Sequence, residues 1–290
     1  MEPSLVILAG GVSSRMKKPS AVPPGTDEQL LREADRLAKA MIGVGRNGRP
    51  FMDYLLFNAR EAGYRDVVLV VGEDNAGIRS YYGSMDRDNE YHGLRISYAV
   101  QKVPPGRTKP LGTADAVVCA MDARPDWAGT KFTVCNSDNL YSHHVLRMLR
   151  ESSDTCALID YDWEALKVDP SKLEQFAVLQ KDAGNYLVRI IEKPPPATIA
   201  AVRDQSGRVG VSMNIFRFSY DMMLQPLIDA PIHPVRQEKE IPSALTMLIA
   251  RHPKSVFAIP VAEEVPDLTD KKDIARVQQY LQQHYPGFEF

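Results

Sequence analysis

Oxygen-bearing side chains that directly follow an apolar segment are the strongest chemical signal in the sequence. Residues 132–135 have the composition of a short strand, and Asn136, Asp138 and Asn139 come after it. A carboxylate at the carboxyl end of a strand is well placed to hold Mg²⁺, which prefers oxygen ligands and shares them with substrate phosphates. Asp138 is therefore a candidate metal ligand and catalytic residue. An acidic residue at this position is also a common turn former, and that alternative stays open.

A turn rich in glycine and serine near the N-terminus is suited to binding phosphate. The apolar residues 5–9 lead directly into it, and Arg15 stands at its far end. Glycine lets the backbone approach a phosphate, main-chain N–H groups and hydroxyls donate to it, and a guanidinium can bind two of its oxygens. The pattern also fits a simple tight turn, and it is neither a P-loop nor a dinucleotide fingerprint. Arg15 is a candidate catalytic residue, and the candidate nucleotide-binding residues here are Ala9, Gly10, Gly11, Ser13 and Ser14.

A second polar strand end precedes a predicted helix that begins with glycine. Gln101 follows a strand-like segment, and residues 111–116 read Leu-Gly-Thr-Ala-Asp-Ala. A helix N-terminus presents free N–H groups and a partial positive charge, which suit a nucleobase edge or a phosphate. A capped helix after a polar loop is the alternative.

These segments, in this order, resemble the motifs of the sugar-nucleotide pyrophosphorylases, which are sugar-1-phosphate nucleotidyltransferases. Residues 8–16, LAGGVSSRM, are similar to the opening loop of that family, and residues 39–52 look like its second half. The resemblance implies that Lys39 is the catalytic lysine that binds phosphate. Alanine occupies position 38, where the family usually has proline, and Lys17 and Lys18 remain alternatives for this lysine.

The same resemblance implies roles for residues further along the chain. Asp138 matches the metal aspartate of the family, and Asp267 in residues 265–270 looks like the second metal ligand, although it is also a candidate helix cap. The remaining residues assigned in this way are Gln101, Gly112 and Thr113 for the nucleobase, and Glu192, Lys193 and Asn214 for the sugar phosphate. Asn214 lies in residues 211–218, which are otherwise typical of an ordinary edge strand.

The elements that must position these residues alternate between strands and helices. Such alternation implies right-handed crossovers and a mainly parallel sheet with helices on both faces, and ligands bind beyond the carboxyl ends of its strands. We expect strands at 5–9, 67–71, 94–100, 132–135, 156–159, 176–180, 186–191 and 256–261, and helices at 51–62, 113–123, 142–151, 220–228, 242–251 and 271–283.

The predicted fold class is α/β with three layers: a Rossmann-like sheet with a small substrate lobe, of the type that the resemblance implies for nucleotide-diphospho-sugar transferases. We expect residues 1–290 to form a single nucleotidyltransferase domain. Residues 1–150 are its predicted nucleotide-binding half, and residues 151–290 are its predicted sugar-phosphate-binding half.

Composition and charge narrow the classes of partner. The 290 residues are 44% hydrophobic and 25% charged, with a net charge of −2, so the chain has no basic field that would attract long nucleic acid. The three cysteines are widely spaced and lack a CxxC pattern, which argues against a disulfide framework or a structural zinc site. The N-terminal apolar run is too short for a signal peptide, and no stretch approaches the ~20 apolar residues of a membrane span. We therefore expect a cytoplasmic protein without nucleic-acid or membrane partners, and the sequence leaves open a homo-oligomer.

The predicted reaction joins a nucleoside triphosphate to a sugar 1-phosphate with Mg²⁺ as cofactor and releases pyrophosphate. Three alternatives stay open: a GT-A type glycosyltransferase, a cytidylyltransferase acting on a non-sugar alcohol phosphate, and a catalytically silent regulatory paralogue that binds a nucleotide sugar. The motifs do not distinguish which nucleotide or which sugar is used.

Overall fold

Short runs of aliphatic residues form the strands at the centre of the sheet. The computed structural model describes residues 2–11, 15–18, 27–168, 170–204 and 206–290. In its first half, β1 (Ser4–Leu8), β2 (Asp66–Val71), β4 (Leu94–Val100) and β5 (Lys131–Asn136) pair in parallel in the order β4-β2-β1-β5. Every residue of β2 is buried, as expected for a strand covered on both faces.

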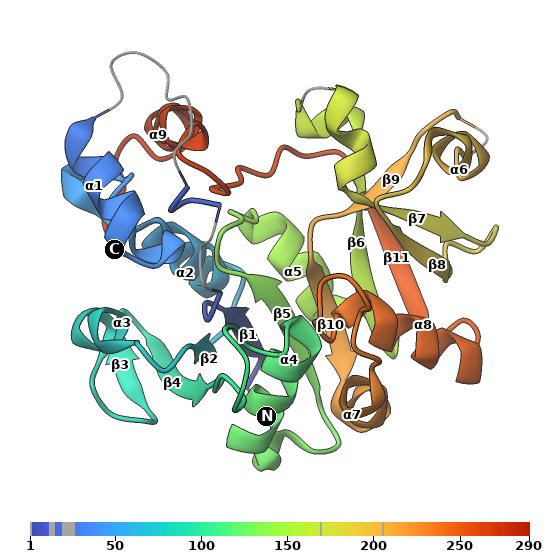
Figure 1. The fold of residues 1–290 in the computed structure, drawn as a ribbon, viewed down its shortest axis with the longest axis horizontal. Coiled ribbons are helices and arrows are strands. Elements are labelled where there is room, and N and C mark those ends of the chain that lie inside the picture. Colours follow the sequence, from blue (N-terminus) through green and yellow to red (C-terminus); the bar gives the residue numbers. More distant parts are fainter. Residues whose placement is uncertain (1, 12–14, 19–26, 169, 205) are drawn as a thin grey trace.

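The second half of the chain extends the same sheet with strands of both directions. Its order continues from β5 through β10, β6, β9 and β7 to β8, while β11 pairs with β6 and β3 pairs with β4 at the opposite edge. Figure 1 shows β5 and β10 between the two groups of strands. The bounds of the added strands are β3 (Asn89–Tyr91), β6 (Cys156–Asp162), β7 (Ala177–Lys181), β8 (Leu187–Glu192), β9 (Gly210–Ser212), β10 (Ile215–Ser219) and β11 (Val256–Val261). The pairings make β1, β2, β4, β5, β6, β7 and β11 run in one direction and β3, β8, β9 and β10 in the other.

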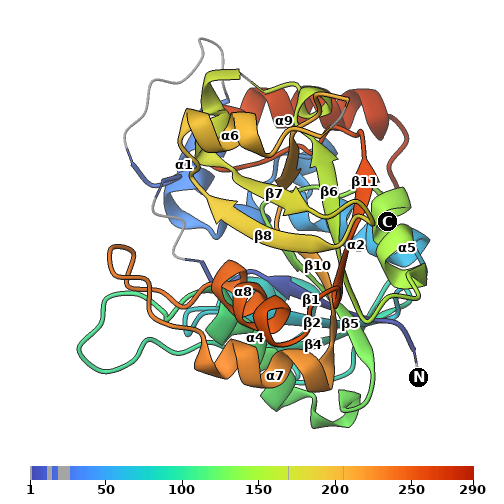
Figure 2. The same cartoon turned by 90° about the vertical axis from the view of Figure 1, so that its right-hand side faces the viewer.

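Helices cover both faces of this sheet, so the molecule has three layers. Successive residues of a strand point to opposite faces; accordingly, Leu5 and Ile7 belong to one hydrophobic core and Val6 to the other. The first core includes residues of α1 (Glu28–Arg36), α2 (Phe51–Glu61), α3 (Ala76–Tyr82), α5 (His143–Glu151), α6 (Pro196–Ala201) and α9 (Asp273–His284). The second core includes residues of α4 (Thr113–Ala123), α7 (Tyr220–Asp229) and α8 (Ile241–Arg251), which lie together on one side of the sheet in Figure 2.

The α/β three-layer class predicted from the sequence is confirmed, and most expected elements agree with the structure to within one to three residues. The helix expected at 142–151 begins one residue later because Ser142 is its N-cap and accepts a hydrogen bond from the Val145 N–H. The edge-strand interpretation of residues 211–218 is wrong for β10, which is bonded on both sides by β5 and β6. Within the described ranges, no helix is both long and apolar enough to cross a bilayer.

Candidate active site

The ends of β1 and β5 bring the glycine turn and the polar residues after β5 to the same edge of the sheet. The parallel register places Leu8 opposite Asn136, and the Ser137 N–H donates to the Leu8 carbonyl at 3.2 Å. A β-carbon at Gly10 would lie 3.2 Å from the backbone nitrogen of Gly72, so the turn packs closely against the end of β2. Gly10 and Asp138 therefore share one cavity wall.

Lys39 forms an ion pair with Asp138 at this edge. It begins a short 3₁₀ helix, Lys39–Met41, and its Nζ lies 3.0 Å from Asp138 Oδ2. The Lys39 side chain is only 12% exposed, so it is not a solvated surface lysine. Lys17 and Lys18 are exposed and lie outside the lining of the cavities around Asp138. The structure thus brings Lys39 to the candidate metal ligand.

Asp267 lies beside Asp138 even though the two are far apart in the chain. Backbone hydrogen bonds join their segments: the Leu268 N–H donates to the Asp138 carbonyl at 2.8 Å, and the Leu140 N–H donates to the Pro266 carbonyl at 2.9 Å. Burial raises the pKa of Asp267 to about 7, and the neighbouring Asp138 carboxylate contributes to this shift. The two acidic groups are therefore close enough to repel each other electrostatically.

Asp267 does not cap α9, because that helix begins at Asp273 and its N-cap residue is Lys272. The Asp273 carboxylate accepts from the N–H groups of Thr269 and Asp270, at 3.0 and 2.8 Å. Asp270 accepts from the Lys272 N–H at 3.0 Å. The Asp267 carboxylate accepts a hydrogen bond from the Thr269 hydroxyl at 2.6 Å. Its remaining oxygen lone pairs are available to a ligand, because Asp267 lines a cavity beside Asp138.

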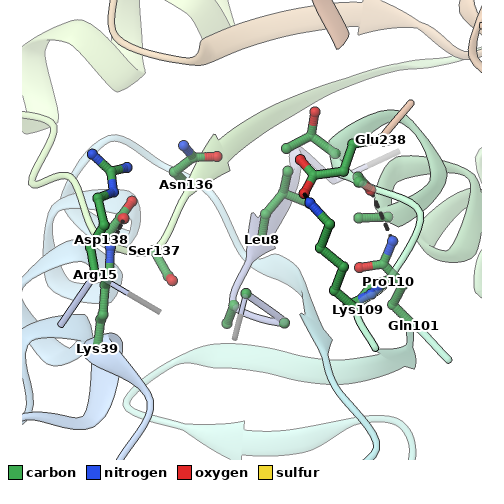
Figure 3. Close-up of a pocket in the computed structure, with 16 residues that line it drawn as sticks. Leu8, Arg15, Lys39, Gln101, Lys109, Pro110, Asn136, Ser137, Asp138 and Glu238 are labelled. Atoms are coloured by element: carbon green, nitrogen blue, oxygen red, sulfur yellow. Dashed lines mark hydrogen bonds and ion pairs between the residues drawn. The ribbon is translucent and has the colours of Figure 1, made fainter. Parts of the chain in front are cut away.

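Two adjoining cavities meet at Asp138. The first has a volume of about 280 Å³ and the second about 300 Å³, and Arg15, Asn136 and Asp138 line both. Figure 3 shows Arg15, Lys39 and Asp138 gathered on one side of the first cavity, with Lys109, Gln101 and Glu238 on the other. An elongated ligand in the first cavity and a second ligand in the next would therefore approach each other beside Asp138 and Arg15.

The first cavity contains the residues predicted to bind the nucleotide, so far as they are described. Its lining includes Ala9, Gly10, Gly11, Gln101, Gly112 and Thr113. Ser13 and Ser14 lie outside the described residues.

Gln101 is fixed in orientation by its neighbours in this cavity. Its Nε2 donates to the Gly112 carbonyl at 2.9 Å and to Asp115 Oδ2 at 2.8 Å. Both partners are acceptors, so the amide must direct its two hydrogens at them, and its oxygen is left for a ligand. Thr113 is engaged within the protein, because its hydroxyl oxygen accepts from the Ile241 N–H at 3.2 Å.

The second cavity contains two of the three residues predicted to bind the sugar phosphate. Glu192 and Asn214 line it together with Asp267. Burial raises the pKa of the Glu192 carboxyl, and the Arg236 guanidinium opposes the shift. Lys193 is exposed and lies outside the lining of both cavities.

Sequence reasoning missed two charged residues of the first cavity. Lys109 Nζ lies 2.5 Å from Glu238 Oε1 and donates to the Arg236 carbonyl at 2.6 Å. These contacts join the loop at residues 101–112 to the loop at residues 230–240. The position of Lys109 three residues before Gly112 was a usable signal, but no motif marks Glu238.

Comparison with known proteins identifies the family. The family model described as nucleotidyl transferase matches residues 25–283. The chain belongs to this family. The resemblance predicted from the sequence motifs is thereby confirmed at the level of the family.

Its similarity to individual nucleotidyltransferases is low in identity and extensive in length. The chain is 21% identical over 285 residues to the bifunctional protein GlmU of Staphylococcus epidermidis, covering 98% of this chain and 53% of that protein. It is 26% identical over 269 residues to a glucose-1-phosphate adenylyltransferase of Rhodopirellula baltica, covering 89% of this chain and 54% of that protein. The chain thus spans about half the length of these two curated relatives.

Solved structures support the fold assignment. The UTP-bound UGPase from Acinetobacter baumannii matches with a TM-score of 0.70 at 19% identity, covering 98% of this chain and 95% of that one. A UDP-glucose pyrophosphorylase complexed with UDP-glucose matches with a TM-score of 0.69 at 14% identity, covering 98% and 99%. At these identities the likeness concerns the fold.

Proposed function

We propose that this nucleotidyltransferase transfers a nucleotidyl group from a nucleoside triphosphate to a sugar 1-phosphate and releases pyrophosphate, with Mg²⁺ as cofactor. The observation that carries the proposal is the junction of two cavities at Arg15 and Asp138, with Lys39 bonded to Asp138. Such a reaction requires two anionic substrates to be held with their reacting groups in line, so positioning and charge neutralisation are its main demands.

The two aspartates fit a magnesium ion. Oxygen ligands suit Mg²⁺, and a cation held by both carboxylates would offset the burial and the Asp138 charge that raise the pKa of Asp267. Within the described part of the chain no three acidic, histidine or cysteine side chains are placed to hold a metal ion together, so the remaining ligands would be water and substrate phosphates. When bound, Mg²⁺ would neutralise phosphate charge as a Lewis acid.

The cationic side chains then act on the triphosphate. Arg15 lies between the two cavities and can bind phosphate oxygens in pairs, which would orient the triphosphate for in-line attack. Lys39 is held at Asp138 and would donate to phosphate oxygens whose negative charge grows as pyrophosphate leaves.

The polar groups at the far ends of the cavities would bind the two substrates apart from the phosphates. In the first cavity the Gln101 amide oxygen would accept a hydrogen bond from the nucleobase. In the second, Glu192 would accept from sugar hydroxyls, with Asn214 beside it. Lys193 directly follows Glu192, and its flexible side chain is assigned to the sugar phosphate.

Two of the alternatives are less well supported by the site. A glycosyltransferase that uses a nucleotide sugar has no need of an arginine and a lysine beside the metal aspartate. A silent paralogue was suggested by Ala38 and by the distance in sequence between Arg15 and Lys39, but Lys39 is in hydrogen-bonding contact with Asp138.

The decisive experiment measures pyrophosphate release with five common nucleoside triphosphates and a panel of sugar 1-phosphates. We expect turnover with Mg²⁺ for at least one pair, and a loss of about 10²–10³-fold in kcat for Asp138→Asn, Asp267→Asn and Lys39→Ala. Asp229→Asn is the matched control, because it removes the same charge at an exposed position outside both cavities, where its carboxylate pairs with Arg251, and it should keep kcat within about threefold. Folded protein that turns over no pair would reject the proposal, and nucleotide-sugar binding without exchange of labelled pyrophosphate would assign the silent paralogue.

A further inference from the structure

A third cavity lies at the opposite end of the sheet from the candidate active site. It has a volume of about 250 Å³. Its lining comes from residues at and before the starts of β1 and β5, from the turn that follows α2, from the end of α5 and from β10. β5 connects it to the active site, since Lys131 begins the strand and Asn136 ends it. At about 3.3 Å per residue, these five steps separate the two regions by roughly 17 Å.

Three cationic side chains line this third cavity: Lys131, Arg150 and Arg217. Arg217 is unusual because it lies in β10, an interior strand whose other residues include the buried Phe216 and Phe218. Its side chain is partly buried and donates to the Ser152 carbonyl. Lys131 donates to the carbonyls of Ser153 and Asp154, at 2.9 and 2.6 Å.

Neither Lys131 nor Arg217 has a carboxylate partner in the described part of the chain. The ion pairs there include neither residue, so their charge is met by backbone carbonyl dipoles. The carboxylates in or beside the cavity have partners of their own. Glu2, which lines it, pairs with Arg95, Glu151 pairs with Arg150, and the Asp154 carboxylate accepts from the Ser152 hydroxyl at 3.2 Å. A partly buried guanidinium normally has an anionic partner, because removing a charge from water is costly unless it is paired.

The cations also disfavour one another. Desolvation lowers the pKa of Lys131, and the charge of Arg217 lowers it further. Desolvation likewise lowers the pKa of Arg217, and the charge of Arg150 adds to that effect. An anion between them would relieve this repulsion.

We propose that this cavity is a binding site for a small phosphate-bearing anion, with Arg217 and Lys131 as its principal ligands. The Arg217 guanidinium has five N–H donors in a planar fork, so donors remain for phosphate oxygens after its bond to Ser152. The Lys131 ammonium has three N–H donors, and one remains after its bonds to Ser153 and Asp154. A volume of about 250 Å³ admits a phosphate group with a small organic body. The site does not depend on the proposed function, because it shares no residue with the cavities around Asp138.

The test measures anion binding by thermal shift and calorimetry on the full chain at constant ionic strength, with inorganic phosphate as the probe. The Lys39→Ala background is used to weaken phosphate binding at the candidate active site. In this background we expect a saturable rise in Tm of about 2–4 °C at phosphate near ten times Kd. Adding Arg217→Gln should weaken binding about tenfold or more, because a charge-assisted hydrogen-bonding group is lost.

Two further variants keep the test decisive. Lys131→Gln removes a cation at the start of β5 and should also weaken binding if Arg217→Gln fails to fold. Arg147→Gln removes the same charge as Arg217→Gln from an exposed position on α5 and should change Kd less than about twofold.

The arms of the titration distinguish the source of the phosphate group. Tighter binding of glycerol 3-phosphate than of inorganic phosphate, with both dependent on Arg217, would assign a phosphomonoester, and the reverse order would assign free phosphate. The proposal would be overturned if the Arg217→Gln and Lys131→Gln variants bound phosphate as tightly as their Lys39→Ala parent. It would also be overturned if Lys39→Ala alone abolished all phosphate binding.

Discussion

Asp267 lies where burial and a neighbouring carboxylate both disfavour its negative charge. Lys39 is nearby, but its Nζ is bonded to Asp138 and compensates Asp267 only at longer range. The arrangement costs folding free energy at neutral pH, and a cation shared by the two carboxylates would remove that cost. A residue kept at this cost is more readily explained by ligand binding than by stability.

The cost at Asp267 predicts a pH-dependent difference between the wild type and Asp267→Asn. The folded protein holds a proton on Asp267 up to about pH 7, whereas the unfolded chain releases it near the ordinary aspartate value of 3.8. Because the folded state binds the extra proton, the contribution of Asp267 to stability rises as the pH falls from about 7 toward 3.8. The asparagine variant lacks this term. In EDTA at pH 8 it should therefore be more stable than the wild type, by on the order of 2 kcal/mol.

Urea unfolding of both proteins at pH 8.0, 6.5 and 5.0 checks this prediction. The difference in unfolding free energy should be largest at pH 8.0, smaller at 6.5 and smaller again at 5.0, and it should vanish only near the ordinary aspartate pKa of 3.8. A difference that stays constant with pH would mean that Asp267 is not the titrating group. The variant should show the same loss of about 10²–10³-fold in kcat while being the more stable protein at pH 8, which separates the role of Asp267 in function from its role in folding.

At the residue scale the sequence predicted the types and positions of the charged groups better than their surroundings. Asp138 was identified because it follows a strand, and ligands bind beyond the carboxyl ends of such strands. Asp267 was identified through the resemblance of residues 265–270 to a family motif. Lys109 and Glu238 were missed because the contact between them depends on the conformations of two long loops. The exposure of Lys193 was equally unpredictable, since it follows from a left-handed backbone conformation with φ of 46°.

The N-terminus of α4 shows how one element is held in place by a distant segment. Gly112 precedes the helix with φ of 111°, and a β-carbon there would lie 2.5 Å from the Lys239 carbonyl oxygen. That carbonyl accepts from the Ala114 N–H at 3.1 Å, so it satisfies one of the free donors at the helix start. The loop that carries Glu238 is thereby fixed over the first cavity.

Gly112→Ala is therefore expected to disturb both stability and nucleotide binding. The variant would force the backbone out of its positive φ and push Lys239 away from the helix, at a cost of about 2–3 kcal/mol. Gly129→Ala is the matched control, because Gly129 also has positive φ, at 77°, but nothing lies within 4 Å of an added β-carbon. It should cost only about 1 kcal/mol.

Thermal unfolding and the KM for the nucleoside triphosphate measure the two effects. Gly112→Ala should lower Tm more than Gly129→Ala and should raise KM, whereas the control should leave KM unchanged. Equal losses of Tm with unchanged KM in both variants would show that the contact with Lys239 does not shape the nucleotide cavity.

At the element scale, prediction succeeded where one periodicity or one apolar run dominated. The Ala-rich helix α4 was predicted with its bounds as observed, since its small residues pack against the sheet. The helices α1, α3 and α6 and the strand β3 were missed. The helices α3 and α6 are only seven and six residues long, and the three-residue β3 forms by pairing with β4. The interior place of β10 could not be deduced because strand order depends on pairings across the whole sheet.

The sheet joins the two halves of the molecule. β10 belongs to the second half, yet it pairs with β5 of the first half along its whole length, from Ile215 opposite Cys135 to Ser219 opposite Lys131. Beyond the end of β5, the Leu268 N–H donates to the Asp138 carbonyl and the Leu140 N–H donates to the Pro266 carbonyl. α4 and α7 also pack against each other across the same boundary, within one hydrophobic core.

We propose on these grounds that residues 1–290 unfold as a single cooperative unit, not as separate halves at 1–150 and 151–290. Removing residues 151–290 would expose the edge of β5 and the apolar face of α4 that α7 and α8 cover, and a half-chain with so much unpaired surface should not keep its native structure. Differential scanning calorimetry of the full chain should give one transition with a calorimetric enthalpy close to the van't Hoff enthalpy. Two resolved transitions, or a 1–150 fragment with a cooperative unfolding transition of its own, would contradict this, because either result would require the β5–β10 pairing to be dispensable for the first half.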